Sequence, residues 1–264
     1  MSGQPIGLFD SGVGGLTVVR ELTEILPQEN IVYLGDTARL PYGNKSPATI
    51  LRFAQENAAF LLRQNIKLLI VACHTACTHA LVALQKELPI PVLGVTIPGI
   101  RALSLASKTG SVAILGTSST INSGALQSLL HKENPGLTIH SIACPLFVPL
   151  VEEGLLDHPA TYSLAEHYLA SLRATPVDAV LLACTHYPLL APLIQQVLGP
   201  HVQLILPARA SAFEAKSFLT TNNLLNPNSS PPSHQFYSSD DPEKFRHLAK
   251  LFSPGKVNEI ILVR

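Results

Sequence analysis

Short apolar runs alternate with longer amphipathic segments along most of the chain. Runs rich in Val, Ile and Leu, typical of buried strands, predict strands over residues 6–10, 31–36, 67–73, 91–96, 111–117, 138–144 and 178–184. Between them, apolar residues recur at helical spacing over residues 16–26, 47–64, 77–88, 123–133, 160–173 and 189–198. This alternation predicts an α/β protein with mostly parallel sheets flanked by helices.

The two halves of the chain repeat this order of elements. Aligning the halves places Asp10 near Thr117 and Cys73 near Cys184, at offsets of similar size. We therefore predict two pseudo-symmetric α/β lobes, with the active site in the cleft between them.

The last part of the chain has a different character. Residues 220–233 are rich in Pro, Asn and Ser and have no core-forming pattern. A strand (234–239), a helix (240–252) and a second strand (259–263) are predicted after them. This tail is too small to fold alone, so we expect it to return to the first lobe. The predicted domains are residues 1–97 with 212–264, and residues 98–211.

Composition and charge narrow the classes of partner. Hydrophobic residues make up 47% of the chain and charged residues only 14%, which leaves apolar surface to bury between layers or at an oligomer interface. Eighteen basic and eighteen acidic residues cancel, and no basic cluster stands out. Neither a nucleic acid nor a membrane is therefore expected as a partner. The lack of a secretion signal and the small number of cysteines favour a cytoplasmic, reduced location.

Four residues whose side chains could take part in catalysis or binding stand at the ends of predicted strands: Asp10, Cys73, Thr117 and Cys184. In open parallel sheets, ligands bind beyond the carboxyl ends of the strands. If the two lobes face each other, the four strand ends converge on one cleft. The two thiols then reach a bound molecule from opposite sides.

Two acid/base groups on opposite faces of one carbon suit inversion of a stereocentre. One group removes a proton and the other returns a proton on the far face, so one cysteine must act as thiolate and the other as thiol. Ionising a cysteine with an ordinary pKa of about 8.5 at pH 7 costs about 2 kcal/mol. A helix N-terminus or a neighbouring side chain can offset that cost, and Asp10 and His186 are the candidates.

Two glycine- and hydroxyl-rich loops favour a small anionic ligand. The loop "DSGVGGLT" brings backbone N–H groups close to the start of a helix, but it lacks the Lys of a phosphate-binding loop and the glycine spacing of a dinucleotide site. The loop "LGTSSTINSG" adds the hydroxyls of Thr117 and Thr120. A small carboxylate fits both loops.

Less specific interpretations compete with this one. A single buried cysteine is more often packed core than catalyst, but two at equivalent strand ends weaken that interpretation. Cys73, His74, Cys77 and His79 could form a metal cluster, although their spacing matches no zinc motif, and no metal is expected. We expect Cys77 and Cys144 to be packed in the core and His79 to lie near the surface.

Several motifs together resemble a known family. The segments "IGLFDSGVGGLTV", "YLGDTARLPYG", "CPLFVPLVEEG" and "ACTHYPLL", with the "AC-x-TA" around Cys73, are similar to those of cofactor-independent glutamate racemases, in the same order and at the same spacing. The segment "FYSSDDPEKFRHLAKLF" resembles the C-terminus of that family. The resemblance implies two lobes, a homodimer and interconversion of L- and D-glutamate for peptidoglycan synthesis, without pyridoxal phosphate or metal.

The resemblance also implies roles for individual residues. Cys73 and Cys184 would be the two bases, assisted by Asp10 and His186, with Glu152 near His186. The residues implied in substrate binding are Ser11, Pro41, Tyr42, Gly43, His74, Thr75, Thr117, Thr120 and Thr185.

One position departs from the family pattern. Where the family has Cys-Asn-Thr, this chain reads Cys73-His74-Thr75. Neutral imidazole can accept a hydrogen bond from an ammonium group, whereas protonated imidazole would repel it. Two alternatives to glutamate racemisation therefore stand beside it: a racemase of aspartate or another acidic amino acid, and a catalytically weak binding or regulatory paralogue.

Overall fold

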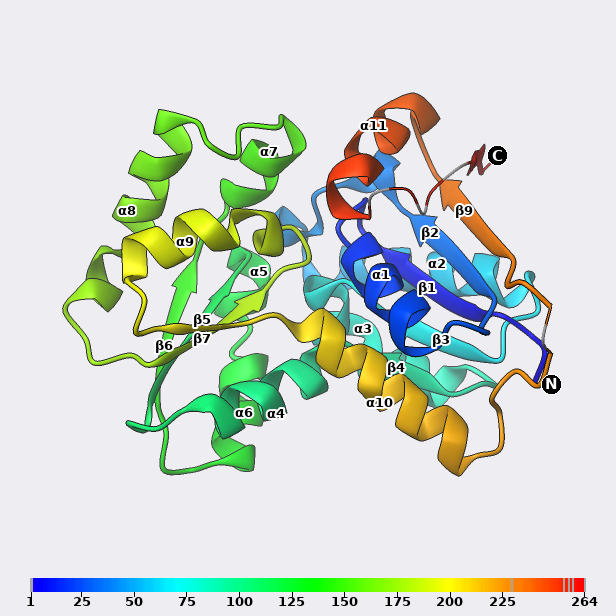
Figure 1. Ribbon diagram of the computed structural model, residues 1–264, viewed down its shortest axis with the longest axis horizontal. Coiled ribbons are helices and arrows are strands. Elements are labelled where there is room, and N and C mark those ends of the chain that lie inside the picture. Colours follow the sequence, from blue (N-terminus) through cyan, green and yellow to red (C-terminus); the bar gives the residue numbers. More distant parts are fainter. Residues whose placement is uncertain (1, 229, 254, 256, 258, 264) are drawn as a thin grey trace.

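The computed structural model describes residues 2–263 apart from 229, 254, 256 and 258, and its strands form two separate parallel sheets (Figure 1). The first sheet contains β1 (Ile6–Asp10), β2 (Ile31–Gly35), β3 (Leu68–Val71), β4 (Val92–Gly94), β9 (His234–Ser238) and β10 (Ile260–Leu262). The second contains β5 (Ser111–Gly116), β6 (Thr138–Ala143), β7 (Ala179–Ala183) and β8 (Gln203–Ile205). Their strand orders are β10-β9-β2-β1-β3-β4 and β6-β5-β7-β8.

Helices cover both sheets (Figure 1). They are α1 (Leu16–Ile25), α2 (Pro47–Leu62), α3 (His74–Glu87), α4 (Thr96–Ala106), α5 (Ser118–Asn122), α6 (Ala125–Glu133), α7 (Phe147–Glu152), α8 (Pro159–Arg173), α9 (Ala191–Leu198), α10 (Pro207–Thr221) and α11 (Pro242–Phe252). Short 3-10 helices lie at η1 (Thr37–Arg39), η2 (Tyr42–Asn44) and η3 (Tyr187–Leu190). The α/β class with mostly parallel sheets is confirmed.

The burial of the central strands explains why the sequence pattern predicts them. All residues of β1, β2, β3 and β7 are buried, as expected of parallel strands covered by helices on both faces. In the first sheet, Ile6 of β1 lies opposite Ile31 of β2 and Leu68 of β3. This register brings the ends of the strands to one edge of the sheet.

The C-terminal segment lies on the first sheet. Strand β9 pairs in parallel with β2, and β10 pairs with β9. Helix α11 begins where the Asp-Pro signal predicts, because the Asp241 carboxylate accepts a hydrogen bond from the Lys244 N–H at 3.0 Å. Residue 229, in the predicted connection 220–233, is outside the described residues.

The sequence did not predict the longer helices α4 and α10 or the short helices α5 and α7. Helix α4 contains Pro98 and Gly99, and α10 buries mainly small side chains, so neither shows a strong amphipathic pattern. Helix α10 packs against both α1 and α4, and it connects the second sheet to the C-terminal segment. The division at residues 97/98 and 211/212 stays a prediction, and α10 runs without interruption across residue 212.

Among the residues that the structure describes, no helix combines the length and apolar character that a membrane crossing requires.

Candidate active site

A small cavity lies where the carboxyl ends of the two sheets meet. Its volume is about 20 Å³, close to what a single water molecule needs. It is lined by Ser11, Pro41, Tyr42, Gly43, Cys73, His74, Thr75, Thr117, Val148, Cys184, Thr185 and His186. A larger cavity of about 180 Å³ lies beside Glu152, between that residue and α11, and no cysteine lines it.

Asp10 anchors the loop after β1. Its side chain is fully buried, accepts a hydrogen bond from the Gly15 N–H at 2.9 Å and receives the Thr185 hydroxyl at 3.3 Å. Burial raises the pKa of the Asp10 carboxyl, although His186, these donors and the Ser11 N–H oppose that effect. Thr185 comes from the other sheet, so Asp10 joins the two lobes behind the cavity.

Cys73 occupies the N-cap position of α3. Its Sγ accepts a hydrogen bond from the Ala76 N–H at 3.5 Å and lies 3.8 Å from Ser11 Oγ. Burial raises the pKa of the Cys73 thiol well above its ordinary value, and the Asp10 charge adds to this. The Ala76 N–H acts in the opposite direction and is outweighed. Cys73 is therefore a thiol at rest, and the expected help from a helix N-terminus does not offset burial.

Cys184 follows β7 and has a basic partner in His186. The His186 Nε2 lies 2.8 Å from Glu152 Oε1, and its ring packs edge-on against Phe252 of α11 with centroids 5.4 Å apart. Burial alone would lower the pKa of His186, but hydrogen bonds to Cys184 and Glu152 raise it to about 10. His186 therefore holds a proton near neutral pH, and its hydrogen bond to Cys184 allows the two side chains to exchange that proton.

Three threonine hydroxyls join the lobes at the cavity wall. Thr75 of α3 lies 3.0 Å from Thr117 and 3.1 Å from Thr120, while these two lie 3.0 Å from each other. Thr117 also caps α5, accepting a hydrogen bond from the Thr120 N–H. Each hydroxyl can donate or accept, so the cluster can adapt to a bound carboxylate or ammonium group.

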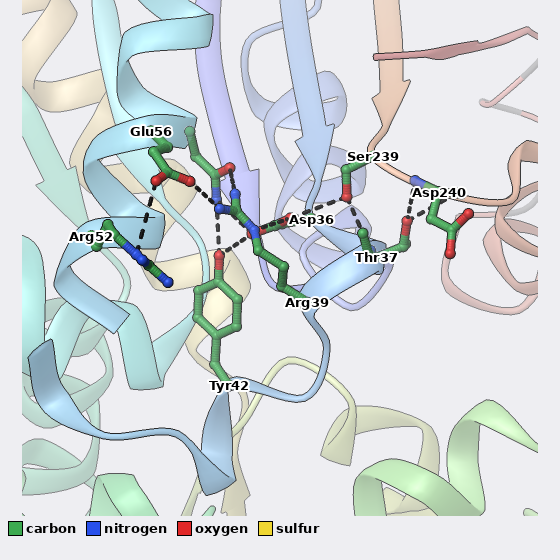
Figure 2. Close-up of polar contacts among 10 residues, drawn as sticks. Asp36, Thr37, Arg39, Tyr42, Arg52, Glu56, Ser239 and Asp240 are labelled. Atoms are coloured by element: carbon green, nitrogen blue, oxygen red, sulfur yellow. Dashed lines mark hydrogen bonds and ion pairs between the residues drawn. The ribbon is translucent and has the colours of Figure 1, made fainter. Parts of the chain in front are cut away.

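The loop after β2 lines the cavity with Pro41, Tyr42 and Gly43, while the Tyr42 hydroxyl is bonded to a carboxylate outside the lining. The Tyr42 hydroxyl donates to the buried Asp36 carboxylate, next to Arg39 (Figure 2). Gly43 approaches the second lobe closely, since an added Cβ would lie 2.6 Å from the Thr117 Cβ. The sequence placed Tyr42 at the site but did not identify Asp36 as its partner.

His74 lines the cavity in a neutral state. Its side chain is buried, and its Nδ1 has no hydrogen-bond partner. Burial lowers the pKa of His74 to about 3, so the imidazole carries no charge near neutral pH. It offers a hydrogen-bond acceptor or donor, according to tautomer, where a cation would repel an ammonium group.

The remaining predicted residues lie just behind the cavity lining. Asp10, Thr120 and Glu152 contact Thr185, Thr117 and His186, respectively. Val148 of α7 lines the cavity and was not predicted, because a valine in an apolar segment carries no chemical signal.

The cysteines outside the cavity lining behave as the sequence predicts. Cys77 and Cys144 are buried in the core. His79 is only partly buried, and its Nε2 lies 2.8 Å from Ser119 Oγ. Within the described part of the chain, no group of three or more His, Cys, Asp or Glu side chains is placed to hold a metal ion.

Comparisons with known proteins agree with this architecture. Residues 6–215 match the family described as Asp/Glu/Hydantoin racemase. A glutamate racemase of Geobacter metallireducens is 44% identical over 263 residues, covering 100% of this chain and 97% of that protein. A glutamate racemase of Syntrophus aciditrophicus is 48% identical over 248 residues, covering 94% of this chain and 92% of that protein.

A solved structure has nearly the same fold. The crystal structure of glutamate racemase from Francisella tularensis in complex with D-glutamate superposes with a TM-score of 0.94 at 38% identity. The match covers 100% of this chain and 98% of that structure.

Proposed function

Because this chain belongs to the Asp/Glu/hydantoin racemase family, we propose that it is a glutamate racemase whose two acid/base groups are Cys73 and Cys184. The observation that carries the proposal is that the two thiols line one cavity from different sheets, Cys73 after β3 and Cys184 after β7. Opposed proton donors and acceptors are what inversion at a carbon requires.

The reaction follows from the surroundings of the thiols. One sulfur, as thiolate, takes the α-proton, and the other, as thiol, delivers its proton to the opposite face; the reverse reaction exchanges these roles. Burial keeps Cys73 as a thiol at rest, and the ammonium group of a bound amino acid would favour its thiolate. The His186 imidazolium, held by Glu152, would exchange protons with Cys184.

The substrate would be held by hydroxyls and backbone groups rather than by basic side chains. The proposed contacts are Ser11, Pro41, Tyr42, Gly43, His74, Thr75, Thr117, Thr120 and Thr185. A cavity of about 20 Å³ is too small for glutamate as it stands, so we infer that the lobes open to admit the substrate and close again around it.

The two alternatives receive less support. The relatives described above are glutamate racemases, which favours glutamate over aspartate. His74 is neutral, and both thiols are present, which argues against a binding-only paralogue.

We extend the proposal to the cellular role. D-Glutamate formed here would serve peptidoglycan synthesis, with neither pyridoxal phosphate nor metal needed for the reaction. All four cysteines are free thiols, which fits a cytoplasmic location. Exposed apolar side chains such as Leu105 and Phe213 fit a homodimer, which sedimentation analysis would test.

Circular dichroism of L-glutamate incubated with the chelator-treated protein in deuterated water tests the reaction. We expect the optical signal to decay with one deuterium incorporated at the α-carbon, as measured by mass spectrometry. Cys73→Ala and Cys184→Ala should each abolish the decay. Turnover of aspartate alone would move the assignment to the sister activity, and no exchange with either amino acid would refute a racemase.

A further inference from the structure

The loop that carries Pro41, Tyr42 and Gly43 is held in place by hydrogen bonds to one buried carboxylate, that of Asp36. Asp36 Oδ1 accepts hydrogen bonds from Arg39 Nε at 2.9 Å and from Ser239 Oγ at 3.0 Å. Asp36 Oδ2 accepts the Tyr42 hydroxyl, Arg39 Nε at 2.7 Å and Asn57 Nδ2 at 3.3 Å. The Asp36 side chain is completely buried, so it depends on these donors.

The C-terminal segment supplies one of these donors from about 200 residues further along the chain. The turn after β9 runs beside the loop (Figure 2). Ser239 Oγ donates to Asp36 and also accepts the Ala38 N–H at 3.0 Å. Thr37 Oγ1 donates to the Asp240 carbonyl at 2.9 Å, and the Ser239 N–H donates to the Gly35 carbonyl at 3.1 Å.

We propose that Ser239 is a positioning residue for the racemase site. Its hydroxyl joins Asp36 to the Ala38 backbone, so it fixes both the start of the loop and the carboxylate that orients Tyr42. The Pro41–Gly43 backbone at the cavity is thereby held at its distance from Thr117. This inference rests on the proposed function, since it assigns Ser239 to the binding of the substrate by that loop.

Loss of the Ser239 hydroxyl affects the loop in two places. The Ala38 N–H loses its acceptor, and Asp36 Oδ1 keeps only Arg39 as donor. Arg39 is itself shared, since its Nη1 pairs with Glu56 and its Nη2 donates to Asn57 at 2.9 Å. The bond from the Ser239 N–H to Gly35 of β2 does not involve the hydroxyl and is kept in this variant. The hydroxyl bonds Asp36 and Ala38, so the consequence of its loss should be local to residues 37–45.

Kinetics of three variants test the role of Ser239. Ser239→Ala should raise the KM for glutamate about 5- to 10-fold while kcat changes less than about twofold, because a loosened binding loop loses uniform binding. Ser239→Thr, which keeps a hydroxyl, should return KM to within about twofold of the wild type. Ser230→Ala, in the exposed connection before β9, is the matched control and should leave both constants unchanged.

Hydrogen exchange by mass spectrometry gives a second measurement that does not depend on turnover. We expect Ser239→Ala to speed exchange in peptides covering residues 37–45 and to leave those covering β1 and β3 unchanged. Unchanged exchange in the loop, a rise across the whole first sheet, or faster loop exchange with an unchanged KM would each overturn the proposal. An inactive wild type with faster loop exchange in Ser239→Ala would instead refute the glutamate assignment and leave the fastening of the loop standing.

Discussion

The two thiols at the cavity have different neighbouring groups. Cys73 has a hydroxyl and one backbone N–H at a helix N-terminus, whereas Cys184 has an imidazolium that is itself held by Glu152. In the proposed two-thiol reaction, the two directions therefore depend on different residues. Substitutions around His186 should change the protonation of Cys184 by altering the nearby charge. Substitutions around Cys73 should change the protonation of that thiol by altering its hydrogen bonds and hydration.

Glu152→Gln should weaken the dependence of stability on pH above neutrality. The pKa of His186 is raised to about 10 in the folded protein, so its stabilising effect is complete below about pH 6.5 and is lost as pH rises through about 10. The slope is at most about 1.4 kcal/mol per pH unit. Urea unfolding at about pH 7 and about pH 9.5 measures it. The matched control is Glu153→Gln, on an exposed neighbour, and equal slopes in all three proteins would contradict the prediction.

His74→Asn should keep racemase activity and improve stability in acid. Because burial lowers the pKa of His74 to about 3, the wild type loses stability as pH falls from about 6.5 towards that value, and the variant lacks this loss. We expect kcat/KM within about tenfold of the wild type, since one neutral hydrogen bond contributes about 1 kcal/mol.

Thermal melts and racemisation assays at about pH 7 and about pH 5 check the prediction for His74. His131→Asn, on the exposed face of α6, is the control. An inactive wild type with an active His74→Asn variant would instead favour a binding-only protein.

The sequence predicts the placement of single residues well where a strand ends. Cys73 and Cys184 do meet at one cavity, and Asp10 lies just behind its lining in contact with Thr185, because parallel strands end at a common edge. Asp36 is the last residue of the predicted strand 31–36, so the same reasoning could have found it. Its contact with Ser239 could not be foreseen, because nothing local links a loop near residue 36 to a turn near residue 239.

At the scale of elements, η2 and α5 meet so closely that only glycine fits at position 43. Gly43→Ala would place a Cβ 2.6 Å from the Thr117 Cβ, so η2 or α5 would have to shift. We expect kcat/KM to fall about 10- to 100-fold, as for other small displacements of positioning groups. Steady-state kinetics measure this effect. Gly136→Ala, whose added Cβ would lie 3.4 Å from Asn134 Oδ1, should match the wild type, and equal losses in both variants would exclude the steric cause.

Helix α10 could not be predicted from hydrophobic periodicity. Its buried positions include Ala208, Ser211, Ala212 and Ala215, and small residues give a weak hydrophobic signal even at regular helical spacing. They are small because α10 packs against both α1 and α4. Strands of Val, Ile and Leu are predictable because burial on both faces selects the large apolar side chains that the pattern detects.

At the scale of the whole molecule, a buried ion pair holds distant segments together. Lys67 Nζ lies 2.6 Å from Glu29 Oε2, with side chains 1% and 2% exposed. The same ammonium donates to the carbonyls of Ser2 at 2.6 Å and Leu224 at 2.8 Å. The N-terminal segment and the connection after α10 therefore share one anchor.

Lys67→Met should lower the free energy of unfolding by about 3–5 kcal/mol, because it leaves the Glu29 carboxylate buried without its cation. Urea denaturation followed by circular dichroism measures the change. Lys86→Met, on the exposed face of α3, is the control and should change stability by less than about 0.5 kcal/mol. A loss of less than about 1 kcal/mol for Lys67→Met would show that the pair does not anchor these segments.

The pairing of β9 with β2 has a consequence for synthesis on the ribosome. Residues 111–205 carry every described strand of the second sheet and leave the exit tunnel before β9 and β10 do. Until β9 has been translated, β2 is an apolar edge strand whose N–H and C=O groups have no partner on the side where β9 will pair. The lobe that is translated first is thus completed last, and its open strand edge makes the growing chain prone to aggregation until the remaining residues have been translated.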